Sequence, residues 1–198
     1  MPFDDIRQRL ESIYAAVREA SGIEFAFDRE DRHSHENSHT FYLRYIGPLP
    51  AGGSVKVDIT IREPLVLPLE ARAVLRAYEE FSDLPDGRIV RTYSLAETAS
   101  EKVLALAYRA RNEPRDLYDL WHLVSCEGVA LSHLAPAITA KLAFRALEAV
   151  GIQEAILRKE ARLKALWSAR LSNQMAVMPP FDQVFGEFRR ALRQSNLP

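Results

Sequence analysis

The sequence has little cysteine: its 198 residues include one, Cys126. A single thiol excludes an internal disulfide framework and is typical of a protein from a reducing compartment. No base lies beside Cys126 in the sequence, so we expect a buried and inert thiol.

Long apolar runs are also missing, since none approaches the roughly 20 residues that span a bilayer. The first ten residues, MPFDDIRQRL, are too acidic for a signal peptide. The formal net charge of -1 gives no overall positive field that would attract nucleic acid, so such binding would need a local basic patch. Hydrophobic residues make up 47% of the chain, which argues against disorder. We therefore expect a soluble, cytoplasmic protein without a membrane partner.

The first part of the chain has the pattern of a helix followed by strands. Apolar residues, among them Ile6, Leu10 and Ile13, recur at helical spacing over residues 3–20, and Gly22 is expected to end this helix. Apolar and polar residues then alternate in the three segments predicted as strands, 22–30, 41–47 and 54–63, with a polar loop over residues 28–40. Three successive strands predict an antiparallel sheet with the helix packed on it.

The later part is predicted to be helical. Residues 70–81 have a helical pattern, and residues 87–93 that of a short strand. Ser94 and Glu97 have the spacing of a capping box and open a helix that runs to about Arg111. Pro114 suits the first turn of the next helix. The remaining helices are predicted over residues 115–124, 132–150, 153–171 and 181–194. A sheet followed by helices places the chain in the α+β class, with one domain over residues 1–93 and a helical one over residues 94–198.

The block YSLAETASEKVLALAYRARNEPRDLYDLWHL, residues 93–123, carries the candidate chemistry. Lys102 and Arg109 are seven residues apart, so they share one face of their helix. In that position they can hold the phosphates of a nucleotide or of an RNA backbone.

Carboxylates complete the constellation. Asp116 and Asp119 share a face near the start of the next helix, and Arg115 is placed four residues before Asp119 for pairing with it. Asp58 projects from the polar face of its strand. Acidic groups that hold Mg²⁺, and cations that stabilise a leaving pyrophosphate, are what nucleotidyl transfer requires.

The same residues also have a simpler interpretation. Arg115 with Asp119 would then be a surface pair worth about 0.3–0.5 kcal/mol. Asp116 would be stabilised by the positive end of its helix, and Lys102 and Asp58 would be solvated. Spacing alone does not decide between the two interpretations.

The block resembles the signature of the AbiEii/AbiGii toxins, a family of polymerase-β-like nucleotidyltransferases. That signature joins Glu-Lys with Ala-Leu and an arginine, followed by Arg-Asp-x-Tyr-Asp-Leu. The strand Lys56–Ile59 is also similar to the family's later carboxylate strand. The residues that match the signature are Glu101, Lys102, Ala105, Leu106, Arg109, Arg115, Asp116, Tyr118, Asp119 and Leu120.

The resemblance implies a role for each candidate residue. Lys102 would contact the incoming nucleotide, and Asp116 would be an essential active-site carboxylate. Asp58 would be the third acidic residue of a Mg²⁺ centre. Arg109 and Arg115 would hold phosphate or brace the site.

The resemblance also implies a fold and a function. The fold would be part of a polymerase-β-like nucleotidyltransferase sheet, followed by the helical region. The function would be that of a toxin from an abortive-infection toxin–antitoxin system, with a cognate antitoxin as partner. Such a toxin transfers a nucleotide from an NTP to an RNA acceptor, in some members the acceptor end of tRNA.

One expected motif is not found in this sequence. The family opens with a Gly-Gly or Gly-Ser turn followed by Asp-x-Asp or Asp-x-Glu, which grips the triphosphate and two metals. Asp4 and Asp5 follow no glycine turn, and Gly52–Ser54 precedes the strand of Asp58. We expect that the sequence starts beyond this motif or is a degenerate member. The alternatives are a catalytically inactive module that binds an antitoxin or RNA, and an unrelated α+β domain with a chance match.

Overall fold

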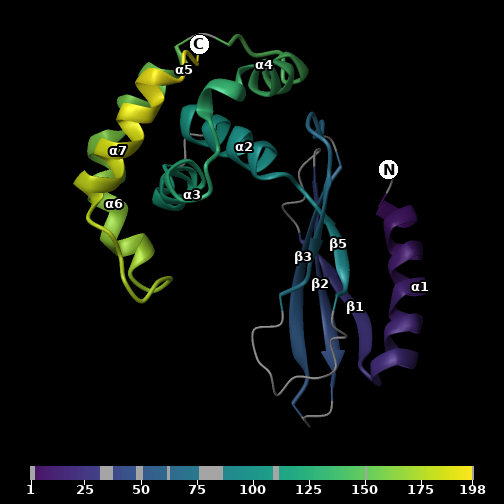
Figure 1. The fold of residues 1–198 in the computed structure, drawn as a ribbon. Coiled ribbons are helices and arrows are strands. Elements are labelled where there is room, and N and C mark those ends of the chain that lie inside the picture. The colour runs from purple at the N-terminus through teal and green to yellow at the C-terminus, as the bar shows by residue number, and fades with distance from the viewer. Residues whose placement is uncertain are drawn as a thin grey trace. The chain divides into compact units, whose positions relative to one another are not determined.

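The chain belongs to the α+β class, as predicted (Figure 1). The computed structural model describes residues 3–31, 38–47, 51–61, 63–75, 87–108, 112–149 and 151–197. Internal contacts divide the chain into two compact units, Met1–Glu63 and Pro64–Pro198. The predicted domain boundary lay at residue 93; by contacts, residues 64–93 group with the helices. No helix among the described residues is long and apolar enough to span a membrane.

The first unit is a helix and a three-stranded antiparallel sheet. Helix α1, Phe3–Ser21, ends at Gly22, whose φ of 70° favours glycine. The strands pair in the order β1-β2-β3, which confirms the predicted meander. Their bounds are Glu24–Glu30, Ser38–Ile46 and Gly53–Thr60. The predicted loop over residues 28–40 was therefore too long at both ends.

A small apolar cluster joins α1 to the sheet. Ile6 of α1 and Phe41 and Leu43 of β2 are buried, and Leu10 packs against them. Ile13 was predicted to belong to the same buried stripe, but its side chain is 53% exposed. The buried face of α1 is thus narrower than the sequence indicated.

The second unit begins with a two-stranded hairpin. Strand β4, Glu70–Ala73, pairs antiparallel with β5, Ile89–Thr92, so the helix predicted from residue 70 is wrong over these residues. Glu, Ala and Arg favour helices locally, but pairing with a distant strand overrides a preference of a few tenths of a kcal/mol per residue. The rest of that predicted helix, residues 76–81, lies outside the described residues.

Helices make up the rest of this unit. Helices α3 and α7 have nearly the predicted bounds, and α2 begins as predicted, although residues 109–111 at its predicted end lie outside the described residues. The bounds are α2 Leu95–Tyr108, α3 Pro114–Ser125, a 3₁₀ turn η1 Leu131–His133, α4 Ala135–Phe144, α5 Ile152–Leu157, α6 Glu160–Leu171 and α7 Phe181–Gln194.

Two predicted helices are interrupted by local backbone turns. Helix α4 stops because Ala146 takes a left-handed φ of 53°, and the Leu147 amide donates to the Leu142 carbonyl at 2.9 Å. A turn at residues 158–159 separates α5 from α6, where the Lys159 amide donates to the Ile156 carbonyl at 3.0 Å. The predictions of single helices over residues 132–150 and 153–171 are therefore wrong.

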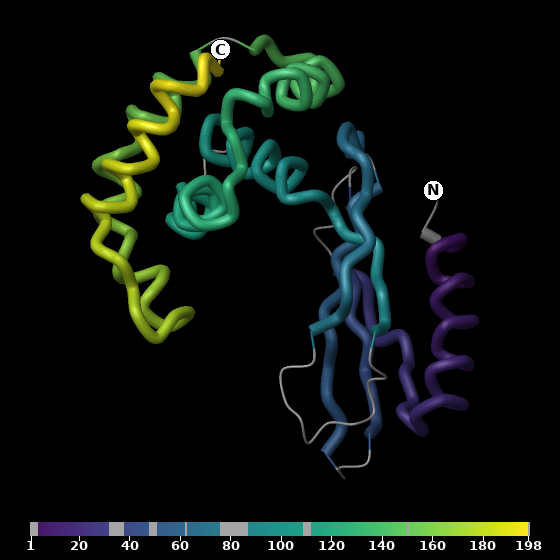
Figure 2. Tube along the Cα trace, in the orientation of Figure 1, coloured from purple at the N-terminus to yellow at the C-terminus, as the bar shows by residue number. Residues whose placement is uncertain are grey.

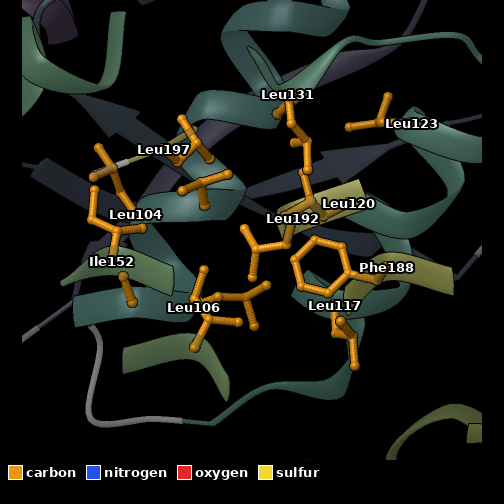
Figure 3. Packing of buried hydrophobic residues seen from close by; sticks show 14 of the residues in the cluster. Leu104, Leu106, Leu117, Leu120, Leu123, Leu131, Ile152, Phe188, Leu192 and Leu197 are labelled. Atoms are coloured by element: carbon orange, nitrogen blue, oxygen red, sulfur yellow. The ribbon is translucent and has the colours of Figure 1, made fainter. Parts of the chain in front are cut away.

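A single large apolar cluster holds these helices together. Leu117 and Leu120 of α3 meet Phe188 and Leu192 of α7, all 2% exposed or less (Figure 3). Helix α7 runs alongside α5 and α6 (Figure 2), where Gln153 Nε2 donates to the Leu197 carbonyl at 2.7 Å. This packing fixes the surface of α2 and α3 on which the candidate site lies.

Candidate active site

Helices α2 and α3 position the residues of the predicted motif. The hydroxyl of Ser94 accepts the N–H of Glu97 at 3.1 Å and so caps α2. Pro114 lies in the first turn of α3, where its lack of an N–H costs nothing. Buried Val103 of α2 and Leu117 of α3 belong to the apolar cluster that joins the two helices.

Lys102 of α2 lies between two carboxylates of α3. Its Nζ is 2.8 Å from Asp116 Oδ1 and 2.6 Å from Asp119 Oδ2. The side chains of Lys102, Asp116 and Asp119 are 25%, 15% and 44% exposed. The three-residue spacing of the aspartates places both on the side of α3 that meets α2. The structure thus brings together two of the predicted site residues, Lys102 and Asp116, and adds Asp119.

The aspartates keep Lys102 charged. Burial alone would lower the pKa of Lys102, but its hydrogen bonds and charge interactions with Asp116 and Asp119 outweigh burial and raise this pKa above its ordinary value. Two of the three N–H donors of Lys102 face these carboxylates, so a phosphate bound by Lys102 would share the cation with them.

The predicted arginines are placed differently. Arg115 does not pair with Asp119: its Nη2 lies 3.7 Å from Glu113 Oε2, just before α3. Its side chain is 49% exposed. Arg109 lies outside the described residues.

Asp58 lies in the first unit, on β3. Cross-strand pairing sets it opposite Thr40 of β2, whose Oγ1 donates to Asp58 Oδ1 at 2.5 Å. Lys56 Nζ is 3.3 Å from Asp58 Oδ2. The hydrogen bond from Thr40, followed by the contact with Lys56, lowers the pKa of Asp58 below its ordinary value.

The described part of the chain gathers no group of three or more His, Cys, Asp or Glu side chains that could hold a metal ion. Asp116 and Asp119 both have Lys102 as partner. Lys102, Asp116 and Asp119 do not form a complete metal site by themselves. Asp58, the metal ligand predicted from the sequence, is a single carboxylate on β3.

A second ionic cluster lies beside the motif, and the sequence reasoning missed it. Lys141 of α4 contacts Glu97 at 2.7 Å and Glu101 at 2.5 Å, and it donates to the Pro64 carbonyl at 2.9 Å. Arg145 binds the other oxygen of Glu101 at 3.0 Å. A signal was present, because Lys141 falls at helical spacing among the buried residues of α4, Ala137, Ile138 and Leu142.

Glu97 does not close the predicted capping box. Its two carboxylate oxygens accept the amides of Val66 and Leu67 at 3.2 and 3.0 Å. The glutamate therefore binds the segment that precedes the hairpin to the start of α2.

Comparison with known proteins agrees with the motif. No curated protein matches the chain. A sequence model of one family, described as nucleotidyl transferase AbiEii toxin of a type IV toxin–antitoxin system, matches residues 3–190. That match covers nearly the whole chain and includes Lys102, Asp116 and Asp119. The chain therefore belongs to the AbiEii family of nucleotidyl transferase toxins.

Proposed function

We propose that this chain transfers a nucleotide from an NTP to an RNA acceptor, with Lys102 and Asp116 as its catalytic residues. The contact of 2.8 Å between Lys102 Nζ and Asp116 Oδ1 carries the proposal, because it joins the two positions to which the family resemblance assigns catalysis. By the same resemblance, tRNA is the acceptor to test first.

The chemistry needs a cation and a proton acceptor. A hydroxyl oxygen of the RNA forms a bond to the α-phosphorus of the NTP, and the bond from that phosphorus to the pyrophosphate oxygen breaks. Negative charge then grows on the pyrophosphate, and the hydroxyl releases a proton. Lys102, kept charged by its raised pKa, stabilises the pyrophosphate. Asp116 orients the ammonium and is the carboxylate we assign to accept the proton.

The arginines support this site in the proposal. Arg115 is half exposed, and its contact with Glu113 is long at 3.7 Å, so it can exchange that partner for a phosphate or for a neighbouring carboxylate. We also propose that Arg109 holds phosphate, and the sole ground for this is its position in the family motif.

Mg²⁺ is the cofactor we propose, with Asp58 as a protein ligand. The nucleotidyltransferase family generally uses a divalent metal. Mg²⁺ is typically held by one or two carboxylates together with substrate phosphates, so a single aspartate fits a metal that arrives with the NTP. The hydrogen bond from Thr40 and the nearby Lys56, which lower the pKa of Asp58, stabilise the charged form of its carboxylate. Bound Mg²⁺ would neutralise charge on the phosphates.

The biological setting follows the family. Its members are toxins of type IV toxin–antitoxin systems, so we propose a cognate antitoxin as partner and the cytoplasm as the place of action. Growth of cells that express the chain, with and without a co-expressed candidate antitoxin, tests this setting.

Labelled NTPs incubated with the purified chain and total RNA test the activity directly. Lys102→Ala and Asp116→Ala are expected to abolish both label transfer and growth inhibition. Lys164→Ala is the matched control, because Lys164 pairs with Asp182 at 2.7 Å on α6 and α7 but both side chains are more than half exposed. Full toxicity in both site variants, or equal loss in the control, would overturn the proposal.

A non-catalytic binding module is the second candidate. It is favoured by the ionic cluster itself, in which Lys102, Asp116 and Asp119 already neutralise one another in part. This candidate predicts a complex with antitoxin or RNA and no turnover of any NTP. Labelling of RNA by the chain would exclude it.

A further inference from the structure

Asp119 has no role in the site as assigned so far, although it makes the shorter contact with Lys102. The distance to Lys102 Nζ is 2.6 Å from Asp119 Oδ2 and 2.8 Å from Asp116 Oδ1. The two aspartates face two of the three N–H donors of this ammonium and balance its charge, so a triphosphate has to compete with them. If the function proposed above is correct, the triphosphate draws Lys102 away from the more weakly held of the two aspartates.

Exposure indicates which contact opens. The side chain of Asp116 is 15% exposed and that of Asp119 is 44% exposed. Water can replace the partner of Asp119 more easily, because an exposed ion pair is weaker than a buried one and an exposed carboxylate needs no desolvation. Asp116, with less of its side chain exposed, would have little water to replace Lys102. The contact with Asp119 is therefore the one that yields.

Helix α3 carries a second cation, Arg115, that can pair with Asp119. Arg115 precedes it by four residues, the spacing at which side chains of opposite charge meet on a helix surface. Arg115 contacts Glu113 at only 3.7 Å, close to the limit for an ion pair. A rotation of two exposed side chains would bring Arg115 and Asp119 together without moving the backbone.

We propose that Asp119 is a positioning residue that restrains Lys102 while no nucleotide is bound and releases it to the triphosphate by turning to Arg115. Asp116 keeps its contact with Lys102 throughout, so the ammonium exchanges only one of its two carboxylate partners, Asp119, for the triphosphate. In this scheme Arg115 braces α3, and the nucleotide competes with Asp119 for Lys102. The proposal rests on the proposed function, because the competing ligand is the triphosphate of an NTP.

The chemical reactivity of Lys102 tests the restraint. Trace acetylation of the folded chain, followed by mass spectrometry of the peptides, measures how fast each lysine reacts. Asp119→Asn is expected to speed acetylation of Lys102 several-fold and to leave Lys164 unchanged. Asp182→Asn is the matched control, since it frees Lys164 from a similar pair and should speed only that lysine. Equal rates for Lys102 in the wild type and in Asp119→Asn would overturn the proposal.

Kinetics test the release. Asp119→Asn is expected to lower the KM for the NTP several-fold and to change kcat much less, and Asp119→Glu is expected to restore the wild-type KM. A loss of kcat as large as that of Asp116→Ala would overturn the positioning role.

Protection by nucleotide separates this inference from the proposed function. Protection of Lys102 by NTP, together with faster acetylation in Asp119→Asn, supports both. Protection without that acceleration overturns the inference alone. If NTP protects Lys102 in none of the variants, the nucleotide does not bind at this site, and both the inference and the proposed function are overturned.

Discussion

Glu97 of α2 and Lys141 of α4 form an ion pair with Nζ 2.7 Å from Oε1, and each side chain is 1% exposed. Burying such a pair costs desolvation free energy, which is offset only when further hydrogen bonds satisfy both groups. Here the lysine also binds Glu101 and the Pro64 carbonyl, and the glutamate accepts the two amides of Val66 and Leu67. The pair therefore joins three segments of the helical unit.

Removing the cation of this pair is expected to destabilise the helical unit strongly. Lys141→Met would leave Glu97 and Glu101 without their shared cation, a loss of about 3–5 kcal/mol for a buried pair. Denaturation by urea measures the free energy of unfolding. Tryptophan fluorescence reports on the helical unit, because both tryptophans, Trp121 and Trp167, lie in that unit. The control Lys164→Met, at an exposed pair, should cost no more than about 1 kcal/mol. Equal losses in the two variants would contradict the prediction.

Glu97→Gln is expected to release the segment that precedes the hairpin. The neutral amide has one acceptor oxygen, so it cannot bind both backbone amides and the ammonium together. Hydrogen exchange should then become faster at Val66 and Leu67 and stay unchanged along α7. Glu101→Gln serves as control, because Glu101 contacts Lys141 and Arg145 but accepts neither amide. Unchanged exchange at Val66 and Leu67 would show that Glu97 does not hold them.

Elements set by local pattern could be predicted from the sequence. Helix α7 follows the spacing of Phe181, Val184, Phe185 and Phe188, all of them buried, and its predicted bounds are those observed. The three strands follow their alternation. Lys102 and Asp116 were singled out by helical spacing and a family motif, and the structure places them in contact.

Features that depend on distant partners could not be predicted. Strand β4 exists because it pairs with β5, and no local pattern of Glu70–Ala73 encodes that partner. Glu97 had the spacing of a capping residue, but Lys141 and the amides near residue 66 compete for its carboxylate. The prediction that Cys126 is buried was wrong: it is exposed, at the C-cap of α3.

The pKa of Asp58 is expected to lie below its ordinary value. The hydrogen bond from Thr40 stabilises the charged carboxylate, so Thr40→Val should raise the pKa of Asp58 toward its ordinary value. Because the folded pKa is the lower one, the contact stabilises the fold above the ordinary pKa, and this contribution is lost as the pH falls through the folded pKa. NMR titration of the carboxyl carbon measures both values. An identical pKa in the two proteins would exclude the hydrogen bond.

The far end of α3 is held by a bond that is independent of the Lys102 cluster. Trp121 Nε1 donates to Glu187 Oε2 of α7 at 2.7 Å. Glu187→Ala should remove this bond, cost about 1–3 kcal/mol and change the fluorescence of Trp121. Gln183→Ala is the control, because Gln183 contacts only the other oxygen of Glu187, at 3.3 Å. Acetylation of Lys102 should be equally fast in both variants, because the buried leucines of α3 still anchor this helix. A changed rate in Glu187→Ala would mean that the bond to α7 also positions the carboxylates that hold Lys102.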